Sequence, residues 1–402
     1  MRATVLTTFL PPETDHDRNG MHRRVGATLR ALASRVDHID MLHIPAPIRQ
    51  TDSLRQSAFW GQPIHTQTLT RHEGQPSFWN DNIRGLADLA HQHPWHRYAG
   101  PGVLRQLQDH LDTRPSLIIV DRLEPMIALR RCHTTAPILL DLNDIEHKMG
   151  RGALLKRPLT LRTSLAWAKW PAILHEERSA ARRATRTAVC SSQDASYLRR
   201  LRFPGTIVTI PNAIALPQHP PGLGTRPTIM LLGTYSYPPN AAAAHRLVTR
   251  IWPLIAAQAP EARLILAGPG SETLPACTTA PSSVEFHGYV PDLAALYAET
   301  RIVCCPLTEG GGTRLKLIEA AAYARPIVST AKGAEGLDLT NGRDILIAET
   351  DAALANACVS LLADPIQCLR LGTAARAAAA PYDLDTVIAS IGIILDDMLA
   401  QT

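Results

Sequence analysis

The chain has 402 residues, of which 45% are hydrophobic and 19% charged, and its net charge is +5. This composition excludes an intrinsically disordered chain, and the length is enough for two or three domains. The basic excess is mild and no basic run is interleaved with aromatic residues. These features argue against a nucleic-acid-binding protein and suit a small anionic ligand or an anionic membrane surface.

The cysteines and the chain start bear on the cellular compartment. The seven cysteines form no C-x-x-C pair and several lie in apolar segments, so we interpret them as reduced core residues without a metal. The first apolar run is too short for a secretory signal and is interrupted by Pro11 and Pro12. No apolar run reaches the roughly 18 residues that a membrane span needs. We therefore expect a cytoplasmic protein with no cofactor.

Apolar, strand-like runs alternate with helix-like runs through the first half of the chain. Strands are expected at residues 3–10, 39–44, 116–121, 136–142, 187–192 and 206–212. A helix is expected over residues 21–35, whereas residues 49–100 show too little periodicity to assign. The runs at 116–121 and 136–142 are apolar almost throughout and each ends in a polar cluster, as buried parallel strands do.

The second half repeats this alternation after a segment rich in proline and glycine, residues 211–227, which predicts a linker. Strands are expected at residues 228–233, 263–268, 284–290, 302–307, 326–330 and 344–348. Between the first two lies a helix, residues 241–258, interrupted at Pro253. We therefore predict an α/β fold with two doubly wound, Rossmann-like domains that face each other across a cleft and bind ligands beyond the carboxyl ends of their strands.

The residues that follow the strand at 302–307 have the chemistry of an anion site. The glycines of 310–312 permit close approach of a ligand to the backbone. A helix expected from about Thr313 directs unpaired N–H groups and the positive end of its dipole at this turn. Arg314 and Lys316 add two positive charges, and the carboxylate of Glu319 can accept from a sugar hydroxyl. The pattern suits a phosphorylated ligand.

The alternative is an ordinary turn in which Arg314 and Lys316 face solvent and Glu319 pairs with one of them. The spacing is not that of a P-loop, because Lys316 follows Arg-Leu rather than glycine. It is not a Rossmann G-x-G-x-x-G either, because the last glycine would fall inside the helix. The stretch AGPGSE at residues 267–272 also lacks the third glycine, which weakens the hypothesis of an NAD-dependent enzyme.

The second half resembles the retaining GT-B glycosyltransferases of the group 1, or family 4, class. The matching stretches are LLGTYSYPPNAAAA, LILAGPG, VEFHGYVPDLAALY, PLTEGGGTRLKLIEAAAYARPIVSTAKGAEGL and PYDLDTV. The first half matches more loosely, at Gly20, at LEP (residues 123–125) and at DLNDIEH (residues 141–147). The resemblance implies an acceptor-binding domain at residues 1–210, a linker at 211–227, a nucleotide-sugar-binding domain at 228–380 and a C-terminal helix at 381–402 that crosses back to the first domain.

The resemblance also implies a donor site. Arg314 and Lys316 would bind the diphosphate, Glu319 the ribose hydroxyls, and the loop that begins at Gly288 the base. The expected donor-binding residues are Gly310, Gly311, Gly312, Thr313, Glu319, Gly288, Tyr289, Val290, Gly233 and Gly20. Arg314, Lys316 and Glu309 are the expected catalytic residues.

The chain departs from the family pattern at two points. Glu309 and Glu319 are ten residues apart (319 − 309) rather than eight, and Gly311 occupies the eight-apart position. The basic pair that usually follows the first strand of the second domain is missing, because GTYSYPPN holds no lysine or arginine. This absence places the phosphate charge on Arg314 and Lys316.

On the acceptor side, the position that is often a histidine in the family is Asn143. Asp144, Glu146 and His147 follow it closely, and Glu124 ends the preceding strand. We expect Glu124, Asn143, Asp144 and His147 on the acceptor side. Each could equally be a helix cap or a turn residue.

The implied reaction moves a hexose-type sugar, with retention, from a UDP- or GDP-linked donor to a glycan, lipid-linked or small-molecule hydroxyl, in bacterial cell-surface polysaccharide or glycoconjugate synthesis. Cations and a helix terminus can stabilise the charge that develops on the leaving diphosphate, so no metal is expected, although Asp15-His16-Asp17 fits a D-x-D metal motif. The alternatives are a non-catalytic nucleotide-sugar-binding subunit and a GT-B-type sugar-nucleotide epimerase or phosphorylase.

A basic segment, residues 148–170, combines lysines and arginines with leucines and two tryptophans. Such a mixture can lie on an anionic bilayer and present a lipid-linked acceptor, which would make the protein peripheral on the inner face of the plasma membrane. The alternative is a basic surface helix that packs Trp167 and Trp170 into the first domain.

Overall fold

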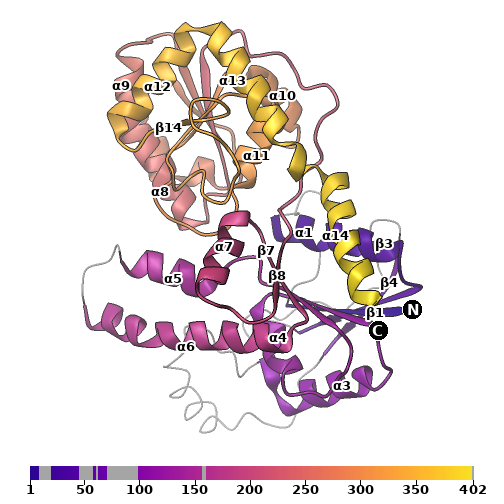
Figure 1. The fold of residues 1–402 in the computed structure, drawn as a ribbon. Helices are drawn as coiled ribbons and strands as arrows, with labels where there is room; N and C mark the ends of the chain where they lie inside the picture. Colours follow the sequence, from indigo (N-terminus) through magenta and orange to yellow (C-terminus); the bar gives the residue numbers. More distant parts are fainter. Residues whose placement is uncertain (9–19, 45–57, 60–61, 70–97, 156–159, 401–402) are drawn as a thin grey trace. The chain divides into compact units, whose positions relative to one another are not determined.

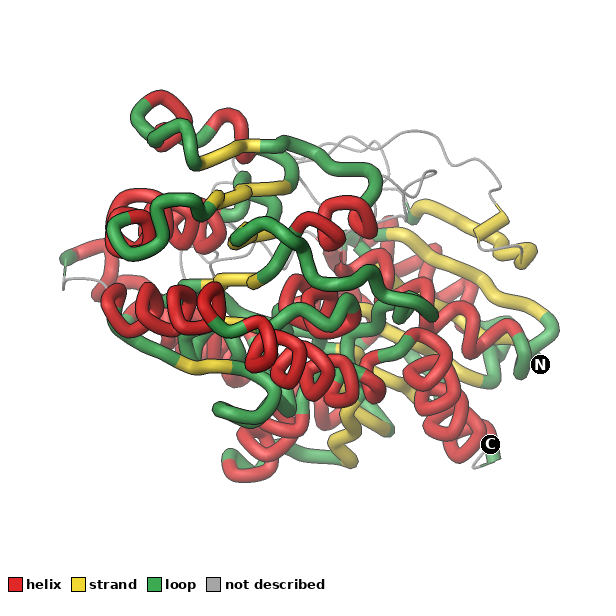
Figure 2. Tube along the Cα trace, turned by 90° about the horizontal axis from the view of Figure 1, so that it is seen from above, coloured by secondary structure: helices red, strands yellow, loops and turns green. Residues whose placement is uncertain are grey.

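The computed structural model describes residues 1–8, 20–44, 58–59, 62–69, 98–155 and 160–400. It contains two compact α/β units, which are described separately (Figure 1). The first unit comprises Met1–Pro211 with Val387–Thr402, and the second comprises Asn212–Thr386. In Figure 2 the strands (yellow) lie among helices (red). Most of residues 49–100, which the sequence left unassigned, lie outside the description.

The first unit is built on an eight-stranded sheet with the order β3-β4-β2-β1-β5-β6-β7-β8. Its strands are β1 (Arg2–Thr7), β2 (His38–His43), β3 (Ala58–Phe59), β4 (Gln62–Thr68), β5 (Leu117–Asp121), β6 (Ile138–Asp141), β7 (Arg186–Val189) and β8 (Thr206–Thr209). All neighbours pair in parallel except β3 with β4. β5 and β6 are buried along their whole length, which explains why their sequences are apolar almost throughout.

Helices cover this sheet. They are α1 (Gly20–Ala33), α3 (Pro101–Leu111), α4 (Leu123–Leu129), α5 (Glu146–Leu154), α6 (Leu161–Arg183), α7 (Ser192–Arg200) and most of α14 (Leu384–Leu399). Asp396 of α14 accepts from the guanidinium of Arg35 at 2.7 and 3.0 Å, and Asp397 pairs with Arg186. These ion pairs join the last helix of the chain to the first unit.

The second unit has a six-stranded sheet with the order β11-β10-β9-β12-β13-β14. Its strands are β9 (Thr228–Leu232), β10 (Arg263–Ala267), β11 (Val284–Phe286), β12 (Ile302–Cys305), β13 (Ile327–Ser329) and β14 (Leu346–Ile347). Every pair of neighbours is parallel. The two parallel sheets confirm the predicted α/β class.

The principal helices of the second unit are α8 (Pro238–Arg246), α9 (Trp252–Ala256), α10 (Leu293–Glu299), α11 (Leu315–Ala322), α12 (Asp351–Ala363) and α13 (Pro365–Ala378). The expected helix at 241–258 is divided by a π-helical turn, Leu247–Ile251, and Pro253 stands in the first turn of α9. Proline has no N–H to continue the helical ladder, and the wider turn before it lets the chain continue past Pro253. α9 lies beside α12, and α11 beside α13 (Figure 1).

Within the described residues, no single helix has the length and apolar composition to cross a bilayer. The bent pair α12–α13 has them only when its two helices are taken together.

Candidate functional site

Three glycine loops lie side by side at the carboxyl ends of the second sheet. Gly233 follows β9 and donates its N–H to the carbonyl of Ala267 at 2.9 Å. Gly268 follows β10 and donates to the carbonyl of Gly288, beyond β11, at 2.6 Å. A Cβ on Gly268 would collide with the backbone of Gly233, so the close approach of these loops requires glycine. The result is a set of closely packed glycine loops at this edge of the sheet.

Lys316, on the first turn of α11, reaches this edge. Its Nζ donates to Oδ1 of Asn240 at 2.6 Å, and the amide of Asn240 is held by a 2.8 Å bond to the carbonyl of Thr234. A Cβ on Gly233 would lie 2.9 Å from Nζ. Burial lowers the pKa of Lys316 from its ordinary value, and the charge of Arg314 acts in the same direction. Lys316 is therefore a positioned cation rather than a solvated one.

Arg314 is held more deeply, with 6% of its surface exposed. Its Nη1 donates to the carbonyls of Gly311 and Gly312, the latter at 2.7 Å. Its Nε and Nη2 are buried and have no hydrogen-bond partner within the described structure. Buried N–H groups of a charged side chain are rarely left unpaired, because each costs about 1–3 kcal/mol. An anion bound at the glycine turn would satisfy them.

The turn that carries Arg314 differs slightly from the expectation. α11 begins at Leu315, two residues after the expected start at Thr313, because Arg314 has φ −86° and ψ 86° and no side chain caps the helix. Thr313 accepts from the amide of Asn212 at 2.6 Å. Gly310 has φ 108°, and a Cβ there would lie 3.1 Å from the Tyr237 hydroxyl and 3.3 Å from Nη2 of Arg314. This crowding explains the glycine at position 310.

The other expected donor-side residues are distributed as follows. The backbone N–H of Gly288 donates to Ser271 at 2.8 Å, and the side chain of Tyr289 beside it is 48% exposed. Val290 packs against the core of the second unit. Glu319 lies on α11 and is partly buried, and Glu309 precedes the glycine turn, also partly buried. Gly20 begins α1 in the first unit.

Sequence reasoning missed the roles of Asn240 and Tyr237. Both lie in the stretch LLGTYSYPPNAAAA, which carries part of the family resemblance and lacks basic residues, and that pattern gives neither side chain a role. Asn240 orients Lys316, and the Tyr237 hydroxyl lies against the glycine turn. A contact across 76 positions leaves no local pattern in the sequence.

In the first unit, a cavity of about 400 Å³ opens at the carboxyl ends of β5 and β6. It is lined by Arg122, Leu123, Glu124, Leu142, Asn143, Asp144, Glu146, Met149, Gly150 and Ile173. Glu124, Asn143 and Asp144, three of the expected acceptor-side residues, are brought together here. Glu124 is 7% exposed, and its Oε2 is buried without a hydrogen-bond partner in the described part of the chain.

The backbone is strained at two residues that line this acidic cavity. Asn143 has φ 58°, and Arg122 has φ 73° with ψ −179°, a region otherwise occupied by glycine. The N–H of Arg122 donates to the carbonyl of Asp141 at 2.8 Å, which holds the two strand ends together. Such conformations cost about 1–3 kcal/mol each and cluster at functional sites.

Glu146 has an unusual pKa. Burial raises it to about 8 from an ordinary value of 4.5, and the nearby carboxylates of Glu124, Glu177 and Asp144 add to the rise, whereas Arg122 opposes it. Glu146 therefore holds its proton at neutral pH. A perturbed carboxyl in a cavity is a common feature of functional sites.

The fourth expected acceptor-side residue, His147, does not line the cavity. It is fully buried, its Nδ1 pairs with Glu177, and its Nε2 lies 3.0 Å from the Tyr197 hydroxyl. Its backbone carbonyl accepts from Trp170 at 2.8 Å. With both ring nitrogens engaged, His147 supports the start of α5. Glu177 lies 30 positions away, so no local pattern in the sequence indicates this pairing.

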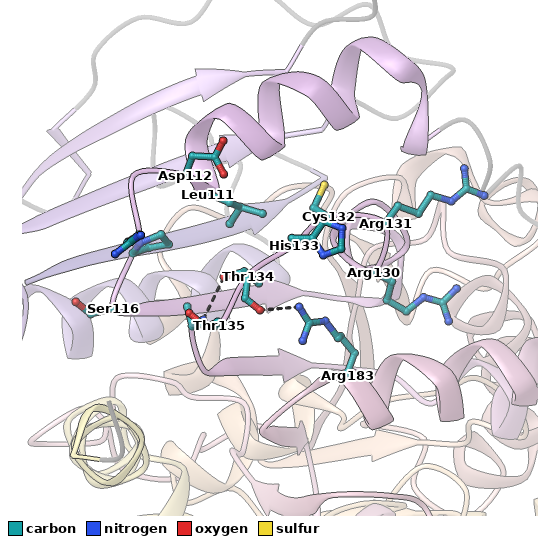
Figure 3. A pocket seen from close by; sticks show the side chains of 13 residues that line it. Leu111, Asp112, Ser116, Arg130, Arg131, Cys132, His133, Thr134, Thr135 and Arg183 are labelled. Carbon is teal, nitrogen blue, oxygen red and sulfur yellow. Dashed lines mark hydrogen bonds between the residues drawn. The ribbon is translucent and has the colours of Figure 1, made fainter.

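A larger cavity of the first unit, about 920 Å³, lies at the other edge of the same sheet (Figure 3). It is lined by residues that precede β5, β6 and β7, including Ser116, Thr134 and Arg183. Arg183 donates to the carbonyl of Thr134 at 2.9 Å. None of the expected site residues lines this cavity, and parallel sheets bind ligands at the carboxyl edge. We therefore take the smaller cavity as the candidate site of the first unit and the glycine turn as the candidate site of the second unit, each by itself.

Candidate metal ligands were also considered. Asp15, His16 and Asp17 lie outside the described residues. Within the described ranges, no three histidine, cysteine or carboxylate side chains converge as metal ligands do.

Comparisons with known proteins bear on the family and the fold. Residues 226–364 match the model of the family described as "Glycosyl transferases group 1". A search of curated proteins gives no match. The chain is similar to a sucrose-phosphate synthase from Thermosynechococcus elongatus, with 18% sequence identity, 100% of both chains covered and a TM-score of 0.71. It is also similar to HepE from Anabaena with UDP, with 14% identity, 98% of this chain and 99% of that chain covered and a TM-score of 0.66. A glycosyltransferase from Rickettsia africae has 12% identity, covers 100% of this chain and 99% of its own and has a TM-score of 0.60. The similarity shows that the two sheets have the fold of GT-B glycosyltransferases.

Proposed function

We propose, from the match of residues 226–364 to the glycosyl transferases group 1 family model, that this chain transfers a hexose-type sugar from a nucleoside diphosphate sugar to an acceptor hydroxyl with retention of configuration. The observation that carries the proposal is the buried guanidinium of Arg314, whose Nε and Nη2 have no acceptor in the described structure and lie beside Lys316 at a glycine turn. The acceptor is a glycan, a lipid-linked sugar or a small molecule, and the pathway is cell-surface polysaccharide or glycoconjugate synthesis in bacteria.

The donor site belongs to the second unit. Arg314 and Lys316 bind the diphosphate, Glu319 accepts from the ribose hydroxyls, and Tyr289 stands beside the base. A uridine nucleotide is the first choice, since HepE, a structural relative, has been solved with UDP-glucose; a guanosine nucleotide is the second. The donor sugar lies against the backbone of Gly310–Gly312, with Glu309 as its nearest carboxylate.

The chemistry follows from the leaving group. Cleavage of the sugar–phosphate bond places negative charge on the diphosphate, and preorganised donors lower the barrier by meeting that charge as it develops. Arg314 supplies two unpaired N–H groups and Lys316 a positioned ammonium, so the reaction needs no metal. Retention is explained if the donor phosphate accepts the proton of the attacking hydroxyl, and this requires no strong protein base.

The acceptor binds in the acidic cavity of the first unit. Glu124, Asn143 and Asp144 line it, and Glu146 completes its polar wall. These groups orient the attacking hydroxyl, and His147 holds α5 in place through Glu177.

The donor site is tested by Arg314→Ala. Loss of hydrogen bonds to a charged group costs about 1.5–3 kcal/mol, so UDP should bind roughly 10–150-fold more weakly by calorimetry, and kcat should fall as well. The matched control is Arg250→Ala, because Arg250 is 68% exposed and its surface pair with Asp351 contributes little. Glu319→Gln should also weaken binding of the nucleotide.

Two results would overturn the proposal. One is Arg314→Ala with the donor affinity and turnover of the wild type. The other is transfer that EDTA abolishes and Mn²⁺ restores. A chain that binds donor but never transfers or epimerises it would be a binding subunit, and release of an epimer without acceptor would identify an epimerase.

We also propose that the segment 148–170 gives peripheral contact with an anionic membrane on its cytoplasmic face. Leu155 is 65% exposed and Arg151 is exposed, whereas Lys148 pairs with Asp194 at 2.7 Å and Trp170 packs on His147. Leu155→Glu should reduce sedimentation with anionic vesicles. Equal recovery of the wild type with neutral and anionic vesicles would refute the contact.

A further inference from the structure

We infer that the acceptor of this enzyme carries a protonated amino group, which binds in the acidic cavity at the carboxyl ends of β5 and β6. The inference rests on the proposed function, because it names the chemical class of the acceptor. It is drawn from the charge, the burial and the unsatisfied groups of this cavity.

The cavity has an excess of acidic groups. Three carboxyl side chains line it, those of Glu124, Asp144 and Glu146, against the single guanidinium of Arg122. A low-dielectric pocket with this balance repels phosphate or carboxylate on the acceptor and attracts a cation. Within the described residues no three of these side chains converge as metal ligands would, so an organic cation fits better than a metal ion.

Glu124 provides an unsatisfied acceptor. Its side chain is more than nine-tenths buried, it lines the cavity, and its Oε2 has no partner among the described residues. A buried carboxylate oxygen requires a donor. An ammonium group offers three N–H donors together with the charge that the carboxylate needs.

The state of Glu146 distinguishes a cation from a neutral hydroxyl. The charges that face it are the carboxylates of Glu124, Asp144 and Glu177, with Arg122 opposing them and His147 engaged by Glu177. Because burial and, after it, these carboxylates raise its pKa to about 8, Glu146 carries a proton at neutral pH. An ammonium ion in the cavity would replace that proton, whereas a neutral hydroxyl would leave it in place.

The size and walls of the cavity suit an amino sugar or an aminocyclitol. Its volume of about 400 Å³ lies at the lower end of the range for small-molecule sites, roughly 300–1,000 Å³. Leu123, Leu142, Met149 and Ile173 form the apolar part of the lining and can pack against the C–H face of a ring.

The experiment is calorimetry on the full chain saturated with UDP, with methyl glucoside and its 2-amino and 6-amino derivatives as probes. We expect an amino derivative to bind at least tenfold more tightly than methyl glucoside at pH 7. Its heat should depend on the ionisation enthalpy of the buffer, because Glu146 releases a proton. Glu146→Gln should keep the preference for the amine and lose the proton release, whereas Glu124→Gln should reduce the preference to below threefold.

The matched control is Asp112→Asn, which removes an exposed carboxylate at the other edge of the same sheet and should leave both readouts unchanged. Equal affinity for methyl glucoside and both amines, or no heat from either amine up to its solubility limit, overturns the inference. The proposed function is judged separately, by binding of UDP and by turnover of donor. A chain that binds and transfers the donor without amine preference keeps the function and loses this inference.

Discussion

Glu146→Gln should make the first unit more stable at alkaline pH. The carboxyl has a pKa of about 8 in the folded chain, raised from 4.5 by burial and by Glu124, Glu177 and Asp144. A group whose folded pKa is raised contributes stability that is fully present below its unfolded pKa and is lost as the pH rises through the folded pKa. The wild type should therefore lose stability between about pH 4.5 and pH 8.

The size of the effect follows from the shift. A difference of about 3.5 pKa units (8 − 4.5) corresponds to roughly 4.8 kcal/mol at 1.36 kcal/mol per unit. Glu146 is only partly buried, so solvent screening and relaxation reduce this upper bound, and we expect about 2 kcal/mol. Glutamine has nearly the same shape as glutamate and stays neutral, so the Glu146→Gln variant should not lose this stability as the pH rises.

The assay is urea unfolding of wild type and variant at pH 5 and pH 9, monitored by circular dichroism. A separate NMR titration of the folded wild type measures the pKa of the Glu146 carboxyl. The difference between the two proteins should change by about 2 kcal/mol between the two pH values, in favour of the variant at pH 9. Comparing the two proteins cancels other titrating groups, such as Asp121, whose pKa is raised to about 7 by burial. A difference independent of pH, or a Glu146 resonance that titrates near 4.5, would refute the reasoning.

Two further substitutions test the backbone at each site. Arg122→Gly should raise the free energy of unfolding by roughly 0–2 kcal/mol, because relief of about 1–3 kcal/mol of strain exceeds the entropic cost of glycine. A clear loss of stability in urea unfolding would contradict the strain. Gly233→Ala should weaken UDP binding roughly tenfold, because a Cβ there would lie 2.9 Å from Nζ of Lys316, whereas Gly222→Ala, which meets nothing within 4 Å, should bind UDP as the wild type does. Equal binding by both alanine variants would remove Gly233 from the donor site.

The sequence by itself determined the α/β class and the positions of most strands. Apolar runs such as those at β5 and β12 are too short for a helix and lack the 3.6-residue period of an amphipathic one, so they indicate buried strands. Their alternation with helices along the chain indicates parallel sheets. The glycine turn was equally readable, because glycine, a helix start and two cations adjoin in the chain. Residues close in sequence are close in space whatever the fold does, so the grouping of these residues at one turn could be predicted.

Only the tertiary structure decided how the remaining groups are used. Asn240 meets Lys316, and Glu177 meets His147, through contacts between residues 76 and 30 positions apart. The raised pKa of Glu146 arises first from burial and then from carboxylates that include Glu124 and Glu177 on separate segments. The strained Arg122 donates its N–H to the end of a neighbouring strand. Burial, charge and strain of this kind depend on which segments the sheet brings together, and that is set by the packing of the whole unit rather than by local sequence.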